Sequence, residues 1–341
     1  MNIIFDKPFK DYSSMVALLQ SRGLIIQDPD FAIQMMSNLS YYNLINKSKN
    51  SFLTCPGTDN YLPGTTFEQL YTLHSIDTSL ENIVLKYILY AEGALKSNLS
   101  YRISQRYGVF TDLHDSNNQN PDDYLYRGNY SRRSPKRIGT LSDMKALMIS
   151  PRSFQHQSSS LRHYLEHHNH VPAWILTTSL TLGSVILWYD ILVPDDKRYV
   201  CNSIIKDSGP MLLEEKLAYF KTVYSLLREY RNLIAHGNKT LASVGTIQLA
   251  NPQVVQLSNG LLTSEEYSSN ASSRSGLHAV LVALFTLMND RYTKASLVKD
   301  LNYVFSAYTG ILIQGKTIPE IFGLPTDILS RFMDAIKIYR T

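Results

Sequence analysis

Hydrophobic residues recur every three or four positions through most of the chain, which is the period of an amphipathic α-helix. The longest regular stretch runs from Thr66 to Tyr107 and predicts one long helix with a single inward-facing stripe. That stripe contains Leu70, Leu73, Ile76, Leu80, Ile83, Val84, Tyr87, Ile88, Ala91, Leu95 and Leu99. Shorter stretches predict helices at 11–22, 29–37, 141–149, 159–168, 174–193, 212–235 and 277–289. One or two final helices follow, with a break between them at IFGLP, residues 321–325.

Two segments depart from the helical pattern. Residues 112–139 are polar and rich in turn residues, which predicts a surface excursion. Between Ser243 and Ser275, the short alternating pieces TIQLA, QVVQL and GLLTS are separated by turn signals, and they predict a small β-hairpin. No alternation of strands and helices and no glycine-rich phosphate loop is visible, so a doubly wound nucleotide-binding sheet is not expected.

The predicted fold is therefore all-α with a small β-hairpin insertion. An N-terminal helical region at 1–65 is expected to pack on a helical core at 66–341. The core would carry a loop insertion at 111–140 and the hairpin insertion at 243–275. Asp28 and Asp30 are candidate N-caps for the helix at 29–37.

Composition places the chain among globular proteins. Of its 341 residues 44% are hydrophobic and 18% are charged, and the net charge of +4 permits a nucleic-acid partner without requiring one. Cys55 and Cys201 are too few for a disulfide scaffold or a cysteine zinc site, which favours the reducing cytoplasm. Residues 171–189 carry no charge over nearly the length of a membrane span, but Pro172, Gly183 and many Thr and Ser residues favour a buried core helix. No signal peptide is expected, because the first residues contain acids and bases and no apolar stretch.

The strongest chemical candidate is LLREYRNLIAHGN at residues 226–238. Arg231 follows Leu227 on the predicted buried face of this helix, and a buried arginine is costly unless it is paired or lines a cleft. His236 lies five residues further on, about 140° around a regular helix. Gly237 suits the left-handed position after a helix end, so we expect a loosened last turn that lets His236 turn back toward Arg231. Alternatively, the two side chains meet the same pair from a second subunit.

These residue types suit metal-independent RNA cleavage. An imidazole can take a proton from a 2′-hydroxyl or give one to the leaving 5′-oxygen near neutral pH, and a guanidinium stabilises the charge that builds on the phosphoryl oxygens. Asn232 could orient the phosphate or the imidazole. A buried polar cap of a core helix is the alternative interpretation. The spacing alone is not specific, because Arg162 with His167 or His168 also satisfies it.

The sequence resembles a known family at several places. RNLIAHGN is similar to the Arg-Asn-x-x-x-His signature of HEPN ribonucleases, an all-helical superfamily. More specifically, the chain resembles the abortive-infection (Abi) proteins of bacteria, of the AbiD/AbiF-like type. The landmarks are KPFKDYSSMVALLQSRGLII at 7–26, LSYYNLI at 39–45, GTTFEQLYTLHSIDTSL at 64–80, AEGALKSNLSYRISQRYG at 91–108, VPAWILTTSLTLGSV at 171–185 and FGLP at 322–325.

This resemblance implies a HEPN-like helical bundle and an anti-phage toxin that cuts RNA. It further implies a homodimer in which two Arg/His pairs face each other, and control by a small noncoding RNA, with no cofactor. Arg231, Asn232 and His236 take the signature positions, and Glu92 and Lys96 match a supporting polar pair. Those two residues could equally form an ordinary surface pair one helical turn apart. Gly237 stands where many relatives have a second histidine, so each subunit has one imidazole here.

RNA contacts are predicted in the excursion YLYRGNYSRRSPKR at 124–137, where tyrosines alternate with cations. Tyrosine rings can stack on unpaired bases while arginines and lysines hold phosphates; a solvated basic loop is the alternative. The candidates are Tyr124, Tyr126, Arg127, Tyr130, Arg132, Arg133, Lys136 and Arg137, with Lys47 and Lys49 as a second basic edge. No zinc site is predicted among His163, His167, His168 and His170, because only Glu166 accompanies them.

Two further functions remain open from the sequence. The protein could be an RNA-binding effector of phage defence that does not cleave its RNA. A toxin that acts on membranes through residues 171–189 is a third and weaker interpretation.

Overall fold

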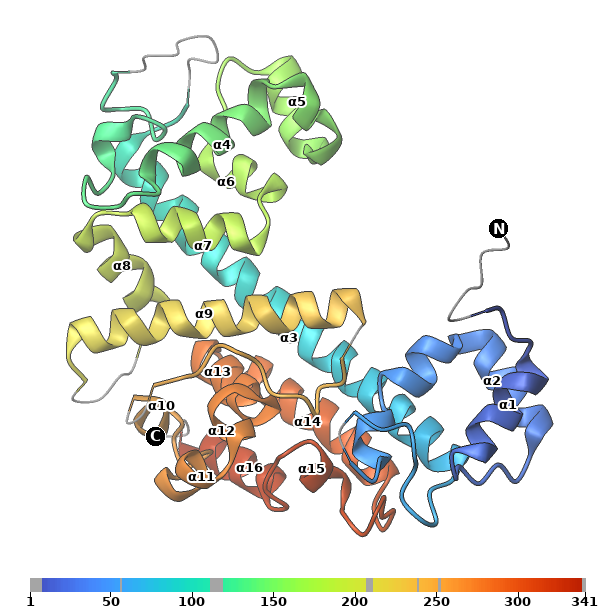
Figure 1. Ribbon diagram of the computed structural model, residues 1–341. Helices are drawn as coiled ribbons and strands as arrows, with labels where there is room; N and C mark the ends of the chain where they lie inside the picture. The colour runs from blue at the N-terminus through green and yellow to red at the C-terminus, as the bar shows by residue number, and fades with distance from the viewer. Residues whose placement is uncertain are drawn as a thin grey trace.

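A single helix, α3 (Phe67–Tyr107), runs through most of the length of the protein in the computed structural model (Figure 1). Its 41 residues correspond to roughly 60 Å at 1.5 Å per residue. The Thr66 side chain accepts from the backbone N–H of Gln69, and the Gln69 side chain accepts from that of Thr66, which fixes the start of the helix. Every residue of the predicted stripe is buried except Ile83, which is half-buried, so the predicted long helix is confirmed.

The structure describes residues 8–55, 57–110, 119–206, 211–237, 239–250 and 253–338. Within these residues it contains sixteen α-helices and only isolated β-bridges, which confirms the all-α class. The other helices are α1 (Tyr12–Ser21), α2 (Pro29–Leu39), α4 (Arg137–Ile149), α5 (Ser159–His167), α6 (Ala173–Leu176), α7 (Leu182–Ile191), α8 (Pro194–Ile204), α9 (Leu213–His236), α10 (Gln253–Leu257), α11 (Ser264–Ser269), α12 (Ala271–Ser275), α13 (Leu277–Leu287), α14 (Arg291–Ala307), α15 (Ile318–Ile321) and α16 (Ile328–Ile338). Short 3₁₀ or π turns lie at Tyr42–Asn46, Lys49–Phe52, Arg127–Asn129, Pro151–His156 and Thr177–Ser179.

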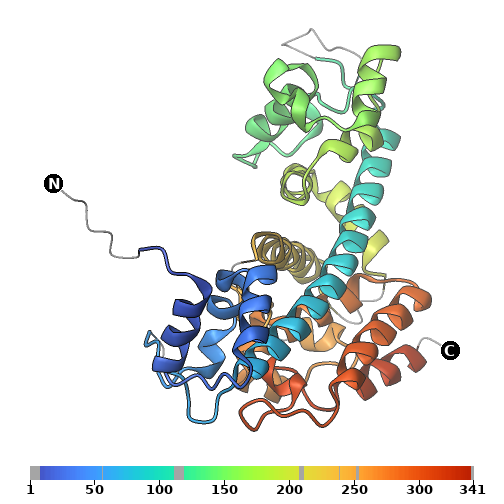
Figure 2. The ribbon, with the colours of Figure 1, turned by 90° about the vertical axis from the view of Figure 1, so that its right-hand side faces the viewer.

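The remaining helices are arranged around α3. Helices α4 to α7 gather at its C-terminal end, α9 crosses its middle, and α10 to α16 lie below that crossing in Figure 1. Figure 2 shows α9 almost end-on beside α3. Helices α1 and α2 pack near the start of α3. The ring centroid of Phe31 lies 6.1 Å from that of Phe67 and 5.4 Å from that of Tyr71, both in edge-to-face contacts. Asp28 caps α2 by accepting from the backbone of Phe31, as predicted.

A buried ionic cluster joins the N-terminal region to the core. The Lys47 ammonium lies 3.0 Å from an Asp77 carboxylate oxygen and 2.8 Å from a Glu81 oxygen, and all three side chains are buried. Asp77 also accepts from the Thr240 hydroxyl and from the backbone N–H of Leu241, in the segment after α9. Burial raises the pKa of Glu81 to about 7. The predicted basic edge at Lys47 is therefore corrected, because its charge is engaged inside the protein.

The uncharged segment at 171–189 folds as two helices rather than one. Helix α6 and a 3₁₀ turn end before Leu180, and Thr181 then caps α7 by accepting from the backbone N–H of Ser184 at 3.2 Å. Leu176, Val185 and Trp188 are fully buried in the core. No helix in the described part of the chain is long and apolar enough to cross a membrane.

The predicted β-hairpin at 243–275 is wrong, since α10, α11 and α12 occupy the described part of this segment. QVVQL forms α10 and buries Val254 and Leu257, which lie one helical turn apart. TIQLA, residues 246–250, precedes α10 and does not form a strand. The Glu229 carboxylate accepts from the backbone N–H groups of Thr246 and Ile247 at the start of this piece. A side chain of α9 thus uses donors that a hairpin ladder would need.

Candidate active site and RNA-binding residues

Helix α9 carries the candidate catalytic residues, and its buried face fixes its position. The Tyr224 hydroxyl donates to the Ala91 carbonyl of α3 at 3.0 Å, inside the core. The Tyr230 hydroxyl lies 3.0 Å from the carbonyl oxygens of both Ser243 and Ser275. The buried residues of this face are Tyr219, Phe220, Val223, Tyr224, Leu226, Leu227 and Tyr230. The end of α9 is thereby held against both α3 and the segment around α12.

The last turn of α9 is regular, in contrast to the loosened turn that the sequence suggested. His236 is the last helical residue, and Gly237 takes the predicted left-handed conformation at φ 62°. The Gly237 N–H donates to the carbonyls of Leu233 and Ile234 at 3.1 and 3.2 Å, which closes the helix directly after His236. Arg231 and His236 therefore leave the helix about 140° apart and point to different sides of it.

Arg231, Asn232 and His236 all have access to solvent. Arg231 and Asn232 are half-buried and His236 is exposed. None of the three side chains forms a hydrogen bond or an ion pair with any residue in the ranges that the structure describes. Arg231 is thus not a buried core arginine, and its donors remain available to an anion.

The helix also presents Arg228, a cation that the sequence analysis did not single out. Arg228 lies four residues before Asn232 and eight before His236, so the three lie along one exposed side of α9. Its guanidinium packs over Gly183 of α7, where an added Cβ would lie 2.9 Å from Nε. The spacing i, i+4, i+8 is visible in the sequence, but Arg231 is the more conspicuous arginine there because it continues the apolar row.

Glu92 and Lys96 form an ion pair with each other at 2.7 Å on α3. Their side chains are 12% and 21% exposed, just after Ala91, where α9 crosses. Within the described chain, neither side chain has a contact with Arg231 or His236 at hydrogen-bonding or ion-pairing distance. The geometry is that of neighbouring charges on one helix, and it leaves their supporting role a prediction.

The predicted RNA-stacking tyrosines are only partly at the surface. Tyr124 and Tyr130 are buried, so their assignment as base-stacking residues is corrected. The Tyr130 hydroxyl donates to the Tyr124 carbonyl at 2.5 Å and accepts from the Trp188 indole N–H at 2.9 Å. Tyr126 is half-buried, and its ring lies so close to Gly128 that a Cβ there would collide with it. The apolar rings of this segment anchor it to the core.

The cations of the same segment mostly face solvent. Arg127, Arg132, Arg133 and Lys136 are exposed, whereas Arg137 is half-buried and lies 3.4 Å from the Arg127 carbonyl. Lys49, in the other predicted basic edge, pairs with Asp59 at 2.7 Å. The basic surface predicted for RNA is therefore concentrated at 127–136.

The histidines of α5 and the residues after it lie close together but do not form a metal site. The ring centroids of His163 and His167 are 4.7 Å apart, and those of Tyr164 and His168 are 4.4 Å apart. In the part of the chain that the structure describes, no group of three or more His, Cys, Asp or Glu side chains could hold a metal ion.

The chain matches a known protein family over most of its length. The family described as Abi-like protein matches residues 34–241, which is more than half of the chain and includes α3, α9 and the motif at 231–236. No curated protein and no solved structure matches the chain.

Proposed function

The chain belongs to the Abi-like protein family, and we therefore propose that it acts in abortive infection as a metal-independent endoribonuclease. A small noncoding RNA would restrain it by binding the exposed cations at 127–136. Family membership supports the defence role. The ribonuclease activity and its restraint rest on the chemistry of the side chains at the end of α9.

The observation that carries the proposal is the set of unengaged polar groups at this helix end. Arg231, Asn232 and His236 have no partner in the described residues, although α9 itself is held firmly by Tyr224 and Tyr230. Polar groups that serve only to cap a core helix would be bonded to backbone or to side chains. A rigid element that presents free donors and an imidazole to solvent is suited to bind and cut a phosphodiester.

The proposed reaction uses two imidazoles and at least one guanidinium. One His236 takes the proton of a ribose 2′-hydroxyl as the 2′-oxygen attacks phosphorus, and the bond from phosphorus to the 5′-oxygen breaks. A second imidazole gives its proton to the departing 5′-oxygen. Arg231 donates to the non-bridging oxygens, where negative charge increases in the transition state. The products are a 2′,3′-cyclic phosphate and a 5′-hydroxyl.

A second copy of the chain is required by this scheme. Each chain has one histidine at the motif, because Gly237 follows it, and Arg231 points about 140° away from His236. A two-fold symmetric dimer would bring two copies of each side chain to one phosphate from opposite sides. The sequence also allows this arrangement, in which each Arg231 and His236 meets the same pair from a second subunit.

The chemistry of the RNA ends tests the proposal. Purified protein incubated with RNA in excess EDTA is expected to cut it and to leave 2′,3′-cyclic phosphate and 5′-hydroxyl ends, because no metal ion takes part. Mass spectrometry of short products identifies the ends. Cleavage that stops on chelation, or that leaves 5′-phosphates, would exclude the mechanism.

Subunit mixing tests the shared site. With a tenfold excess of His236→Ala chains, about a tenth of the wild-type chains would pair with another wild-type chain, so cleavage per wild-type chain should fall roughly tenfold. The same excess of Arg162→Ala chains serves as the control: these chains keep His236, so total cleavage should rise in proportion to the chains added and cleavage per chain should stay unchanged. Undiminished cleavage in the presence of the His236→Ala chains would show that each subunit acts alone.

The second candidate function is that of an RNA-binding effector that does not cleave. The divergence of Arg231 and His236 within one chain favours it, because a monomer could hold RNA without catalysing transfer. Intact RNA after prolonged incubation, together with tight binding, would support this function.

A further inference from the structure

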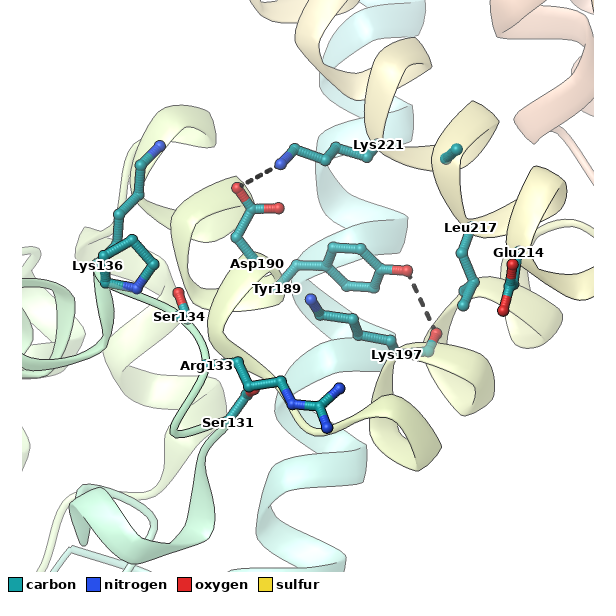
Figure 3. A pocket seen from close by; sticks show the side chains of 12 residues that line it. Ser131, Arg133, Ser134, Lys136, Tyr189, Asp190, Lys197, Glu214, Leu217 and Lys221 are labelled. Atoms are coloured by element: carbon teal, nitrogen blue, oxygen red, sulfur yellow. Dashed lines mark hydrogen bonds and ion pairs between the residues drawn. The ribbon is translucent and has the colours of Figure 1, made fainter.

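A pocket lies near the start of α9, away from the candidate active site (Figure 3). Its walls come from α7, α8, α9 and the loop at 131–136, and its volume is about 540 Å³. This is within the range of small-molecule sites, roughly 300–1,000 Å³. Leu217 in its wall and His236 are separated by roughly 28 Å of helix, at 1.5 Å per residue.

The lining of the pocket is strongly basic. Four cations line it, namely Arg133, Lys136, Lys197 and Lys221, against the two acids Asp190 and Glu214. Lys221 is neutralised by Asp190, at 3.0 Å. The excess charge of the lining is therefore close to +2, and three of the cations have no acidic partner at this distance among the described residues.

Lys197 is the most informative of these cations. It is half-buried, and its ammonium forms no hydrogen bond or ion pair with any described residue. Burial lowers its pKa, Asp190 counteracts this, and Lys221 adds to the lowering. The Tyr189 hydroxyl donates to the Lys197 carbonyl at 3.4 Å, which helps to fix this residue in the wall. Figure 3 shows the side chains of Lys197 and Arg133 extending between the loop and the helices.

We propose that this pocket binds the terminal phosphate of a nucleotide, either a free mononucleotide or the phosphorylated end of an RNA. A phosphate monoester carries a charge of about −1.5 to −2 at neutral pH, which matches the excess positive charge of the lining. Lys197 and Arg133 would hold the phosphate. Pro135, Leu217 and Ala218 provide apolar wall for the sugar or base, and the volume exceeds that of a phosphate ion alone.

The inference does not depend on the proposed ribonuclease activity. The pocket uses none of the side chains at the end of α9, so a chain that cannot cleave would still bind the phosphate. A His236→Ala chain that has lost cleavage should therefore still bind phosphate in the pocket. If the pocket does not bind phosphate, the cleavage experiment can still succeed or fail independently.

Calorimetric titration of the full-length protein tests the pocket, with adenosine 5′-monophosphate and adenosine as probes. The monophosphate is expected to bind and adenosine is not. Lys197→Met and Arg133→Gln should each weaken binding of the monophosphate about tenfold or more, since each removes a charge that contacts the phosphate. Arg198→Gln is the matched control, because Arg198 is exposed on α8, the helix that carries Lys197, and does not line the pocket. It should leave the affinity unchanged.

A second titration identifies the source of the phosphate. A short RNA with a 5′-phosphate that displaces the monophosphate, when the same RNA with a 5′-hydroxyl does not, would assign the pocket to RNA ends. Displacement by neither RNA would assign it to a free mononucleotide. The proposal is overturned when neither phosphorylated probe binds, or when both pocket variants bind as tightly as the wild type. Arg133 is exposed, so its variant decides the matter even where Lys197→Met fails to fold.

Discussion

Replacing His236 with alanine is expected to lower the rate of RNA cleavage by about 10²–10⁴-fold, because both proton transfers lose their imidazole. Binding of RNA should change little, since His236 is exposed and helps to hold no other residue in the described chain. Single-turnover cleavage with excess protein measures the first quantity, and fluorescence anisotropy of a labelled RNA measures the second.

The control for this experiment is His167→Ala. His167 also ends a helix, is exposed, and lies five residues after an arginine, Arg162. The His167→Ala variant should cleave at the wild-type rate, because an arginine and a histidine five residues apart are not by themselves a catalytic pair. Growth arrest or phage protection that persists in His236→Ala, with RNA still bound, would end the ribonuclease proposal and leave the non-cleaving effector.

Replacing Asp77 with alanine is expected to lower the free energy of unfolding by about 3–5 kcal/mol. The substitution would remove one of the two buried carboxylates that face the Lys47 ammonium. It would also leave the Thr240 hydroxyl and the Leu241 N–H without their acceptor. Urea unfolding followed by circular dichroism measures the change.

Asp59→Ala is the matched control for that change. Asp59 pairs with Arg22 at 2.8 Å and with Lys49 at 2.7 Å, but its side chain is 44% exposed. Ion pairs at the surface contribute about 0–1 kcal/mol each, so its loss should be small. Equal losses in the two variants would show that the buried cluster contributes no more than a surface pair.

The helical part of the fold could be predicted because burial repeats with the helical period. In α3 the apolar stripe, the Thr66 cap and the terminal Gly108 all indicate the same element. Helix α8 was missed, since only Val200, Cys201 and Ile204 among its apolar residues are buried, although Pro194 marked its start.

The prediction of a β-hairpin at 243–275 was wrong for a different reason. Short apolar pieces do not distinguish a strand from one turn of helix, and here the decision came from tertiary contacts. The Glu229 carboxylate occupies the backbone donors of Thr246 and Ile247, and no pattern within the piece itself records that.

The candidate residues could be named from the sequence, and their role stays a prediction, but their arrangement in space could not be predicted. The sequence located Arg231, His236 and the left-handed Gly237. It could not show that the helix stays regular to its end, nor that Tyr130 and Lys47 are buried, because both depend on partners distant in the chain. The local sequence around Tyr130 or Lys47 does not show whether the side chain faces solvent or a buried partner such as Trp188.

One carboxylate joins the N-terminal region to the segment that follows α9. Asp77 binds Lys47 on one side and the backbone of Leu241 on the other, and Leu241 lies four residues after the left-handed Gly237 that closes α9. If the first fifty residues separated from α3, Asp77 would lose its counter-ion, Lys47. The segment that follows α9 would then lose its acceptor for the Leu241 N–H, so the packing of the N-terminal region on α3 also helps to hold the end of α9 in place.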